Sequence, residues 1–153
     1  MPTFKYSYDR FDPLTHVRAS GREVNVSPKA TREVCRAIKG WSLPRAKNYL
    51  QDVMALKAVV HFRRYNKEVG HARSSEKFHA GRYPVKAAKE VLTVLEAVES
   101  NAEFKGLDAE RMRIIHAASH RGRKVQGFTP RAFGRASPSN NTLTHIELVA
   151  GEV

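Results

Sequence analysis

The sequence has few of the residues that stabilise or export secreted proteins. Cys35 is the single cysteine among 153 residues, so an internal disulfide is excluded, and a buried thiol in a reducing cytosol is the simplest interpretation. No apolar run approaches the length of about 20 residues that a membrane span needs. Residues 1–13 contain acids and tyrosines where a signal peptide would have an apolar core. We therefore expect a cytoplasmic chain of one domain.

Acidic residues are also scarce. The sequence has 27 Lys and Arg residues against 15 Asp and Glu residues, which gives a formal net charge of +12. Such a surface repels itself unless it meets a polyanion, so nucleic acid is the expected partner. Binding to a membrane surface would need a basic amphipathic helix with exposed Trp, Phe and Leu, and the sequence shows none.

The motifs of common enzymes are missing as well. The sequence has no phosphate-binding glycine loop followed by Lys and Ser or Thr, no nucleophile elbow and no HExxH. We therefore expect a protein that is not an enzyme and needs no cofactor.

The charge imbalance is greatest between Arg111 and Ile146, where the sequence has no Asp or Glu. A solvated surface normally mixes charges of both signs, so a segment of one sign indicates phosphates as partners, although a flexible loop with accidental bias is the alternative. Arginine predominates, and guanidinium groups both bind phosphate through paired hydrogen bonds and stack on bases, which suits folded RNA. The expected RNA-binding residues of this segment are Arg111, Arg113, Arg121, Arg123, Lys124, Arg131 and Arg135.

Three segments have the apolar spacing of amphipathic helices. The first spans residues 27–40 and begins with a Ser-Pro pair, the second runs from 42 to about 59, and the third runs from 84 to about 101. Residues 1–25 show no sustained period, so we expect an irregular or briefly extended N-terminal arm.

Residues 61–83 also lack a regular period, and cations outnumber acids in them. We name this segment the basic loop. It supplies six further expected RNA-binding residues: Arg63, Arg64, Lys67, Arg73, Lys77 and Arg82.

Histidines occur in the basic loop and near the C-terminal end of the chain. No cysteine pair accompanies them, and strand geometry would hold His116 and His120 about 13 Å apart, too far for one metal ion. We expect no metal site.

Two strands are predicted toward the C-terminus. Residues 112–119 are apolar at almost every position and residues 143–149 alternate, so the two segments should pair. Glycine, proline and asparagine interrupt residues 121–141, which therefore predict a protruding arm. The expected fold is α+β: three helices packed on a small antiparallel sheet, with a long protruding β-hairpin arm over about 111–149 and its tip at about 121–141.

The arm carries a recognisable motif. TPRAFGRA at 129–136, followed by THIEL at 144–148, resembles the hairpin of the ribosomal protein L22 family. Four upstream motifs resemble the archaeal and eukaryotic branch of that family: KYSY at 5–8, VSPK at 26–29, FRR at 62–64 and AGRYP at 80–84. The resemblance thus covers nearly the whole chain.

The resemblance implies a structural constituent of the large ribosomal subunit. Such a protein would bind large-subunit (23S-type) rRNA, help assembly by bridging RNA domains, and contact neighbouring large-subunit proteins. Its hairpin would line the nascent-peptide exit tunnel and face the nascent polypeptide, with Arg123 and Lys124 on the outgoing side. The residues implied at the tunnel are Gln126, Gly127, Phe128, Thr129, Pro130, Arg131, Ala132, Phe133, Gly134, Arg135 and Ala136.

The alternative is a free RNA-binding or RNA-processing factor that uses the same basic loop and arm outside the ribosome. Both interpretations predict affinity for RNA. They differ in whether the native protein sediments with the large subunit in high salt.

Overall fold

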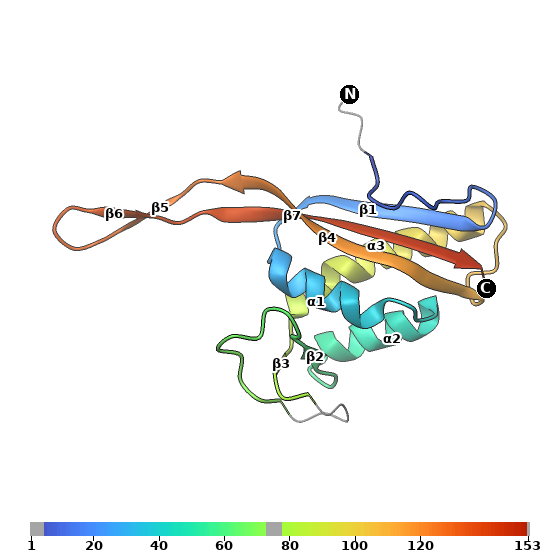
Figure 1. The fold of residues 1–153 in the computed structure, drawn as a ribbon, viewed down its shortest axis with the longest axis horizontal. Helices are drawn as coiled ribbons and strands as arrows, with labels where there is room; N and C mark the ends of the chain where they lie inside the picture. The colour runs from blue at the N-terminus through green and yellow to red at the C-terminus, as the bar shows by residue number, and fades with distance from the viewer. Residues whose placement is uncertain (1–4, 73–77, 153) are drawn as a thin grey trace.

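A three-stranded antiparallel sheet and three helices form the body of the protein, in a computed structural model that describes residues 5–72 and 78–152 (Figure 1). The strands lie in the order β1-β7-β4. Their bounds are β1 His16–Val24, β4 Met112–Val125 and β7 Asn141–Glu152. The helices are α1 Pro28–Ile38, α2 Leu43–Met54 and α3 Val85–Phe104. This arrangement confirms the predicted α+β class.

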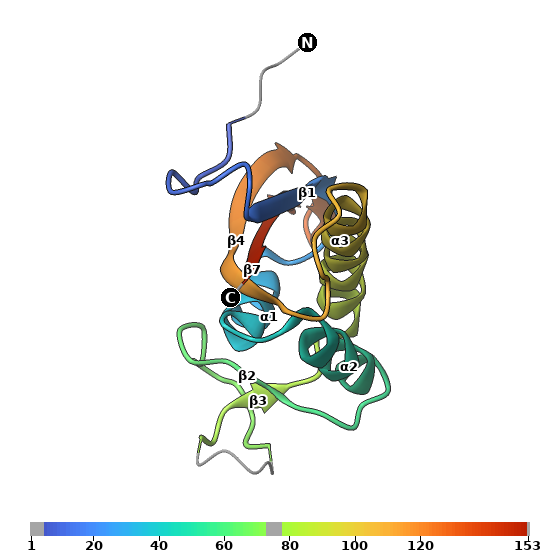
Figure 2. The same ribbon diagram turned by 90° about the vertical axis from the view of Figure 1, so that its right-hand side faces the viewer.

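The helices cover one face of the sheet (Figure 2), where α3 packs against β1 and α1 packs against β4. Alternate residues of the central strand β7 face this core, so Ile146, Leu148 and Ala150 are buried with helix residues such as Leu50 and Leu95. The alternation along β7 therefore places every second side chain of this part of the strand in the core.

The helix starts agree with the sequence pattern, but two helix ends differ from it. The second helix ends at Met54 instead of continuing to about Val59, because Leu56 adopts a left-handed φ of 61° and the Lys57 N–H turns back to the Asp52 carbonyl. The third helix continues past Asn101 to Phe104 and stops before Gly106, whose φ is 73°.

The prediction of an irregular or briefly extended arm over residues 1–25 did not foresee that its second half is a regular strand of the sheet. His16–Val24 forms the edge strand β1 and pairs with β7, with Val17 and Ala19 buried against the helices. Arg18 alone separates these two apolar positions and Ser20, Gly21 and Arg22 follow them, so the alternation is too short to stand out in the sequence.

The hairpin of β4 and β7 extends well beyond the body (Figure 1). Pairing runs from Met112 opposite Glu152 to Val125 opposite Asn141, with a register shift between Arg121 and Lys124. Two short strands, β5 Phe128–Pro130 and β6 Ala136–Pro138, continue it to the tip. The two predicted strands thus pair as expected and are longer than predicted.

The basic loop is more ordered at its ends than its sequence suggests. A two-residue ladder joins β2 Val60–His61 to β3 Gly81–Arg82, and a bridge joins His71 to Ala80. These contacts hold the start and the end of the loop together. The expected RNA-binding residues Arg73 and Lys77 lie outside the described residues.

Cys35 lies on the core side of α1 and is buried, as expected. Burial raises the pKa of its thiol to about 12. We expect the native protein at pH 8 to react with a thiol reagent only on unfolding, because the thiolate is the reactive form. Labelling at increasing urea concentrations measures this, and rapid labelling without urea would contradict it.

Candidate nucleic-acid interface

The start of α1 lies between the basic loop and the root of the hairpin. Ser27 and Lys29 line a pocket of about 640 Å³ together with the basic loop. The same two residues line a second hollow of about 430 Å³ with Arg121 and Lys124 of the hairpin. The basic loop and the arm, far apart in sequence, are therefore joined into one surface by α1.

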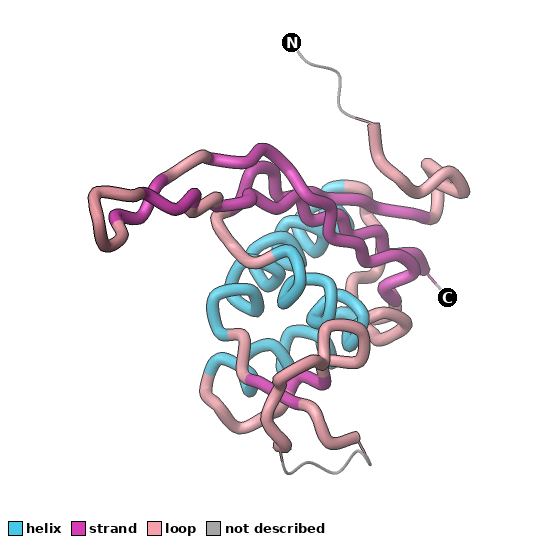
Figure 3. Tube along the Cα trace, turned by 60° about the vertical axis from the view of Figure 1, so that its left-hand side comes forward, coloured by secondary structure: helices cyan, strands magenta, loops and turns pink. Residues whose placement is uncertain are grey.

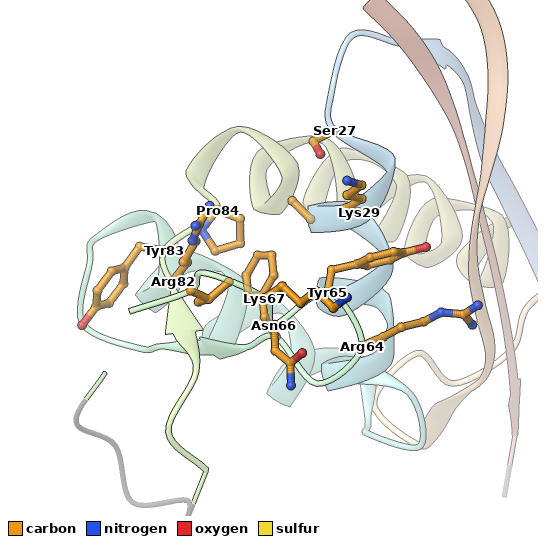
Figure 4. A pocket seen from close by; sticks show the side chains of 12 residues that line it. Ser27, Lys29, Arg64, Tyr65, Asn66, Lys67, Arg82, Tyr83 and Pro84 are labelled. Atoms are coloured by element: carbon orange, nitrogen blue, oxygen red, sulfur yellow. The ribbon is translucent and has the colours of Figure 1, made fainter. Parts of the chain in front are cut away.

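The larger pocket combines cations with aromatic rings (Figure 4). Among the described residues, those that line it include no Asp or Glu. Phosphates attract such a lining and bases can stack on its rings. Its cationic and aromatic members are Lys29, Arg64, Lys67, Arg82, Phe62, Tyr65 and Tyr83.

A buried carboxylate holds the beginning of the basic loop. Glu33 of α1 is 1% exposed, and its side chain accepts hydrogen bonds from the backbone N–H groups of Arg63, Arg64 and Tyr65 at 3.2, 3.1 and 3.4 Å. The Arg32 guanidinium also donates to it at 3.2 Å. Because the carboxylate binds the backbone, the Arg63 and Arg64 side chains remain directed to the surface, where both residues are exposed.

Aromatic side chains position two of the loop arginines. The Arg63 guanidinium lies 4.9 Å from the centre of the Phe78 ring, and that of Arg82 lies 5.9 Å from the Phe62 ring. Stacking of this kind restricts a flexible side chain, while the N–H groups at the edge of a guanidinium can still donate hydrogen bonds in its own plane.

Polar contacts attach the hairpin root to the segment before α1. The buried Thr144 hydroxyl donates to the Val26 carbonyl at 2.7 Å, and the Asn141 amide donates to the Asn25 side chain at 2.7 Å. These bonds hold the root cations beside α1.

Beyond the root, the arm has only its own two strands for support (Figure 3). Its tip turns at Phe133 and Gly134, whose φ angles are 57° and 66°, and the Arg131 N–H donates to the Arg135 carbonyl across the turn at 2.8 Å. Phe128 and Phe133 are 71% and 93% exposed. An arm with exposed rings and exposed cations is typical of a segment that is buried by a partner.

The structure separates the predicted cations into two groups. Arg121, Arg123, Lys124, Arg131 and Arg135 are exposed on the arm. Arg111 and Arg113, at the beginning of the acid-free stretch, form the second group.

Arg111 and Arg113 lie at the opposite end of β4, near the C-terminus (Figure 1). The Arg111 guanidinium forms an ion pair with the Asp108 carboxylate at 3.2 Å. The backbone of Arg113 forms an isolated antiparallel β-bridge with Ser42. A count of acids within the stretch misses this ion pair, because Asp108 lies three residues before the stretch begins.

Sequence reasoning also missed members of the interface. The sequence gives Lys29 only as part of a family motif, and it gives no reason to expect that Tyr65 and Tyr83 line the same pocket. The Ser-Pro helix start is a usable signal for Lys29, because a lysine at the second helical position lies at the exposed end of the helix.

A second buried carboxylate, Glu147 of β7, holds the other side of the hairpin base. It accepts hydrogen bonds from the Ser7 hydroxyl at 2.7 Å, from the Ser7 backbone N–H at 3.0 Å and from Arg22 at 3.2 Å. Burial acts to raise the pKa of Glu147, but the bonds from Ser7 and the charges of His120 and Arg22 lower it below its ordinary value of 4.5.

Acid should therefore weaken the fold through Glu147. A carboxylate whose pKa is lower in the folded protein stabilises it above pH 4.5, and this stabilisation is lost as the pH falls through the folded pKa. We expect the free energy of unfolding to fall less between pH 6 and pH 3 in Glu147→Gln than in the wild type. Urea titrations at both pH values measure this, and parallel losses would refute it.

Two further properties of the described residues concern membrane-spanning helices and metal sites. In the described part of the chain, no helix is long and apolar enough to cross a membrane. The same residues include no group of three or more His, Cys, Asp or Glu side chains that could hold a metal ion.

Comparison with known proteins agrees with the resemblance seen in the motifs. The family described as ribosomal protein L22p/L17e matches residues 19–151. The protein of Nitrosopumilus maritimus named large ribosomal subunit protein uL22 is 48% identical over 153 residues, covering 100% of both chains. Proteins of the same name from Methanocella arvoryzae and Archaeoglobus fulgidus are 50% and 46% identical, covering 94% and 98% of this chain and 94% and 97% of their own lengths.

These matches span the body, the basic loop and the arm together. A family of ribosomal proteins also supports the expectation that the chain is not an enzyme. The chain belongs to the ribosomal protein L22p/L17e family.

Proposed function

We propose that this chain is a structural constituent of the large ribosomal subunit and binds its rRNA through the basic loop, the start of α1 and the arm. The observation that carries the proposal is the continuous cationic surface in which Lys29 lies beside Arg64 and Lys67 in one pocket and beside Arg121 and Lys124 in the next. The relatives named above are large-subunit proteins by name.

The body and the arm would bind different parts of the RNA. The pocket lies between α1 and the basic loop of the body, and the arm extends away from the body (Figure 1). A protein whose RNA-binding surface runs from the body to a distant arm tip can bridge RNA domains during assembly, since the two ends of the surface can engage different RNA segments. Neighbouring large-subunit proteins would contact the parts of the protein surface that the RNA does not cover.

The arm tip would line the nascent-peptide exit tunnel. Phe133 at the tip is exposed, and a large exposed ring is typical of a surface that a partner covers. The tip also extends beyond the helices of the body (Figure 3). A photo-crosslinking residue in place of Phe133 should capture a nascent chain on stalled ribosomes. The same probe in place of Leu14, which is exposed on the body, should not. Equal capture at both positions would contradict this assignment.

Sedimentation and salt titration test the main proposal. The native protein should sediment with the large subunit in high salt, and the affinity of the free protein for large-subunit rRNA should fall by orders of magnitude between about 50 and 200 mM salt, because each neutralised phosphate releases counterions. Recovery only in light fractions would support a free RNA-binding factor instead. A flat salt response would count against RNA binding by this surface.

A further inference from the structure

We propose that the pocket between α1 and the basic loop binds one unpaired RNA nucleotide, with its base against the aromatic rings and its phosphate against the cations. This inference rests on the proposed function for the identity of the RNA. It adds a defined binding site for a single extruded nucleotide within a surface that otherwise contacts RNA backbone.

The size of the pocket fits a small ligand. Its volume of about 640 Å³ lies within the range of about 300 to 1,000 Å³ that small-molecule sites occupy. A smooth RNA duplex presents phosphates and riboses and cannot insert into a pocket of this kind, whereas an unstacked nucleotide can. The concave shape therefore favours an extruded nucleotide over a helix backbone.

The arrangement of side chains suits the parts of a nucleotide (Figure 4). Tyr65 lies beside Lys29 and Arg64, whose charged groups are 5.8 and 5.9 Å from its ring centre. Tyr83 lies at the other end of the pocket, next to Arg82, and is 43% exposed. Each ring that could stack on a base thus has a cation close by that could bind the attached phosphate.

The walls are held in place before any ligand binds. The Tyr65 backbone N–H donates to buried Glu33, which lies in α1 and is fixed by the core. The opposite wall follows the β2–β3 ladder, where Gly81 packs so closely that an added Cβ would clash with the Val59 side chain and with Ala72. A site with fixed walls loses less conformational entropy on binding than a flexible loop does.

The lining also selects against an anionic or purely apolar protein side chain as the occupant. One carboxylate would leave the aromatic rings without a planar partner, and a purely apolar group would desolvate the four cations without a partner. A nucleotide supplies both a negative phosphate and a planar ring, so it matches both parts of the lining.

Affinity measurements on Tyr83 variants test the proposal. Tyr83→Leu removes the ring at an exposed position, and we expect it to weaken binding to cognate large-subunit rRNA about tenfold, without changing the slope of log affinity against log salt. Lys67→Gln should weaken binding and reduce the slope by about one, because it removes a phosphate contact. Tyr83→Phe keeps the ring and should bind like the wild type.

The matched control is Phe104→Leu. Phe104 is 93% exposed at the end of α3, outside the pocket, so its replacement should leave affinity unchanged. If Tyr83→Leu and Phe104→Leu both bind like the wild type, with the steep salt dependence intact, the pocket assignment is overturned and the proposed function stands. If the wild type itself fails to bind the RNA, both are overturned.

Ultraviolet crosslinking of native large subunits gives a readout that does not depend on variant folding. We expect peptides that carry a single-nucleotide adduct at residues 62, 64–67 or 82–84, because these residues line the pocket. Nucleotide adducts confined to residues 121–141 would overturn the proposal, and so would a protein crosslink at the pocket residues in place of a nucleotide.

Discussion

Replacing Glu33 by alanine is expected to lower the free energy of unfolding by about 3 kcal/mol, because it leaves buried hydrogen-bond donors without an acceptor. Three backbone N–H groups of the basic loop and the Arg32 guanidinium donate to this carboxylate. Urea denaturation measures the stability. RNA affinity should also fall, since the loop cations lose their fixed position.

Glu33→Gln and Glu96→Ala are the matched variants. The amide introduced by Glu33→Gln retains one acceptor oxygen for the Arg64 and Tyr65 N–H groups but places an NH₂ group toward Arg63, so about half of the loss is expected. Glu96 is exposed on α3, and its replacement should change stability by less than about 0.5 kcal/mol. Equal stability of the two alanine variants would show that Glu33 does not organise the loop.

The helices and the hairpin could be predicted because their signals are local. The Ser-Pro pair at residues 27 and 28 marks a helix start by itself, and a left-handed glycine at position 40 marks its end. The arm could be predicted because residues 121–141 contain too few apolar residues to form a core. Each of these inferences needed only neighbouring residues in the chain.

Contacts between distant segments could not be predicted in this way. Strand β1 exists because Val17 and Ala19 are covered by helices that follow it in the chain. Glu33 looks like an ordinary helix-surface acid in the sequence, yet it faces the backbone of residues 63–65 and is buried. Its role depends on a loop 30 residues further along the chain.

The same limit explains how the expected RNA-binding cations are distributed over the fold. Arg111 and Arg121 belong to one acid-free stretch, but strand β4 carries them to opposite ends of the sheet. Lys29, by contrast, lies outside the stretch and is brought to the root of the arm by α1. Charge along the chain therefore predicts the kind of partner, and the fold decides which cations meet it.

Neutralising the arm should produce the largest loss of RNA affinity of any change considered. In a variant that carries Gln in place of all five exposed arm cations, we expect the slope of log affinity against log salt to decrease by about 4, and affinity at about 0.1 M salt to fall about a thousandfold. The five residues are Arg121, Arg123, Lys124, Arg131 and Arg135. Stability should change little, because none of these five side chains belongs to the core cluster of the described residues.

A control variant with the same change in net charge separates contact with RNA from general attraction. Five exposed cations of the body that are not among the expected RNA-binding residues are replaced by Gln: Arg10, Lys39, Arg45, Lys57 and Lys89. If long-range attraction alone governed binding, the two variants would lose affinity equally, and the arm would have no special role. If the arm cations each bind a phosphate, the control should keep most of the wild-type slope, since counterions are released only where a protein charge replaces them. The difference between the two slopes therefore counts the phosphates that the arm itself binds.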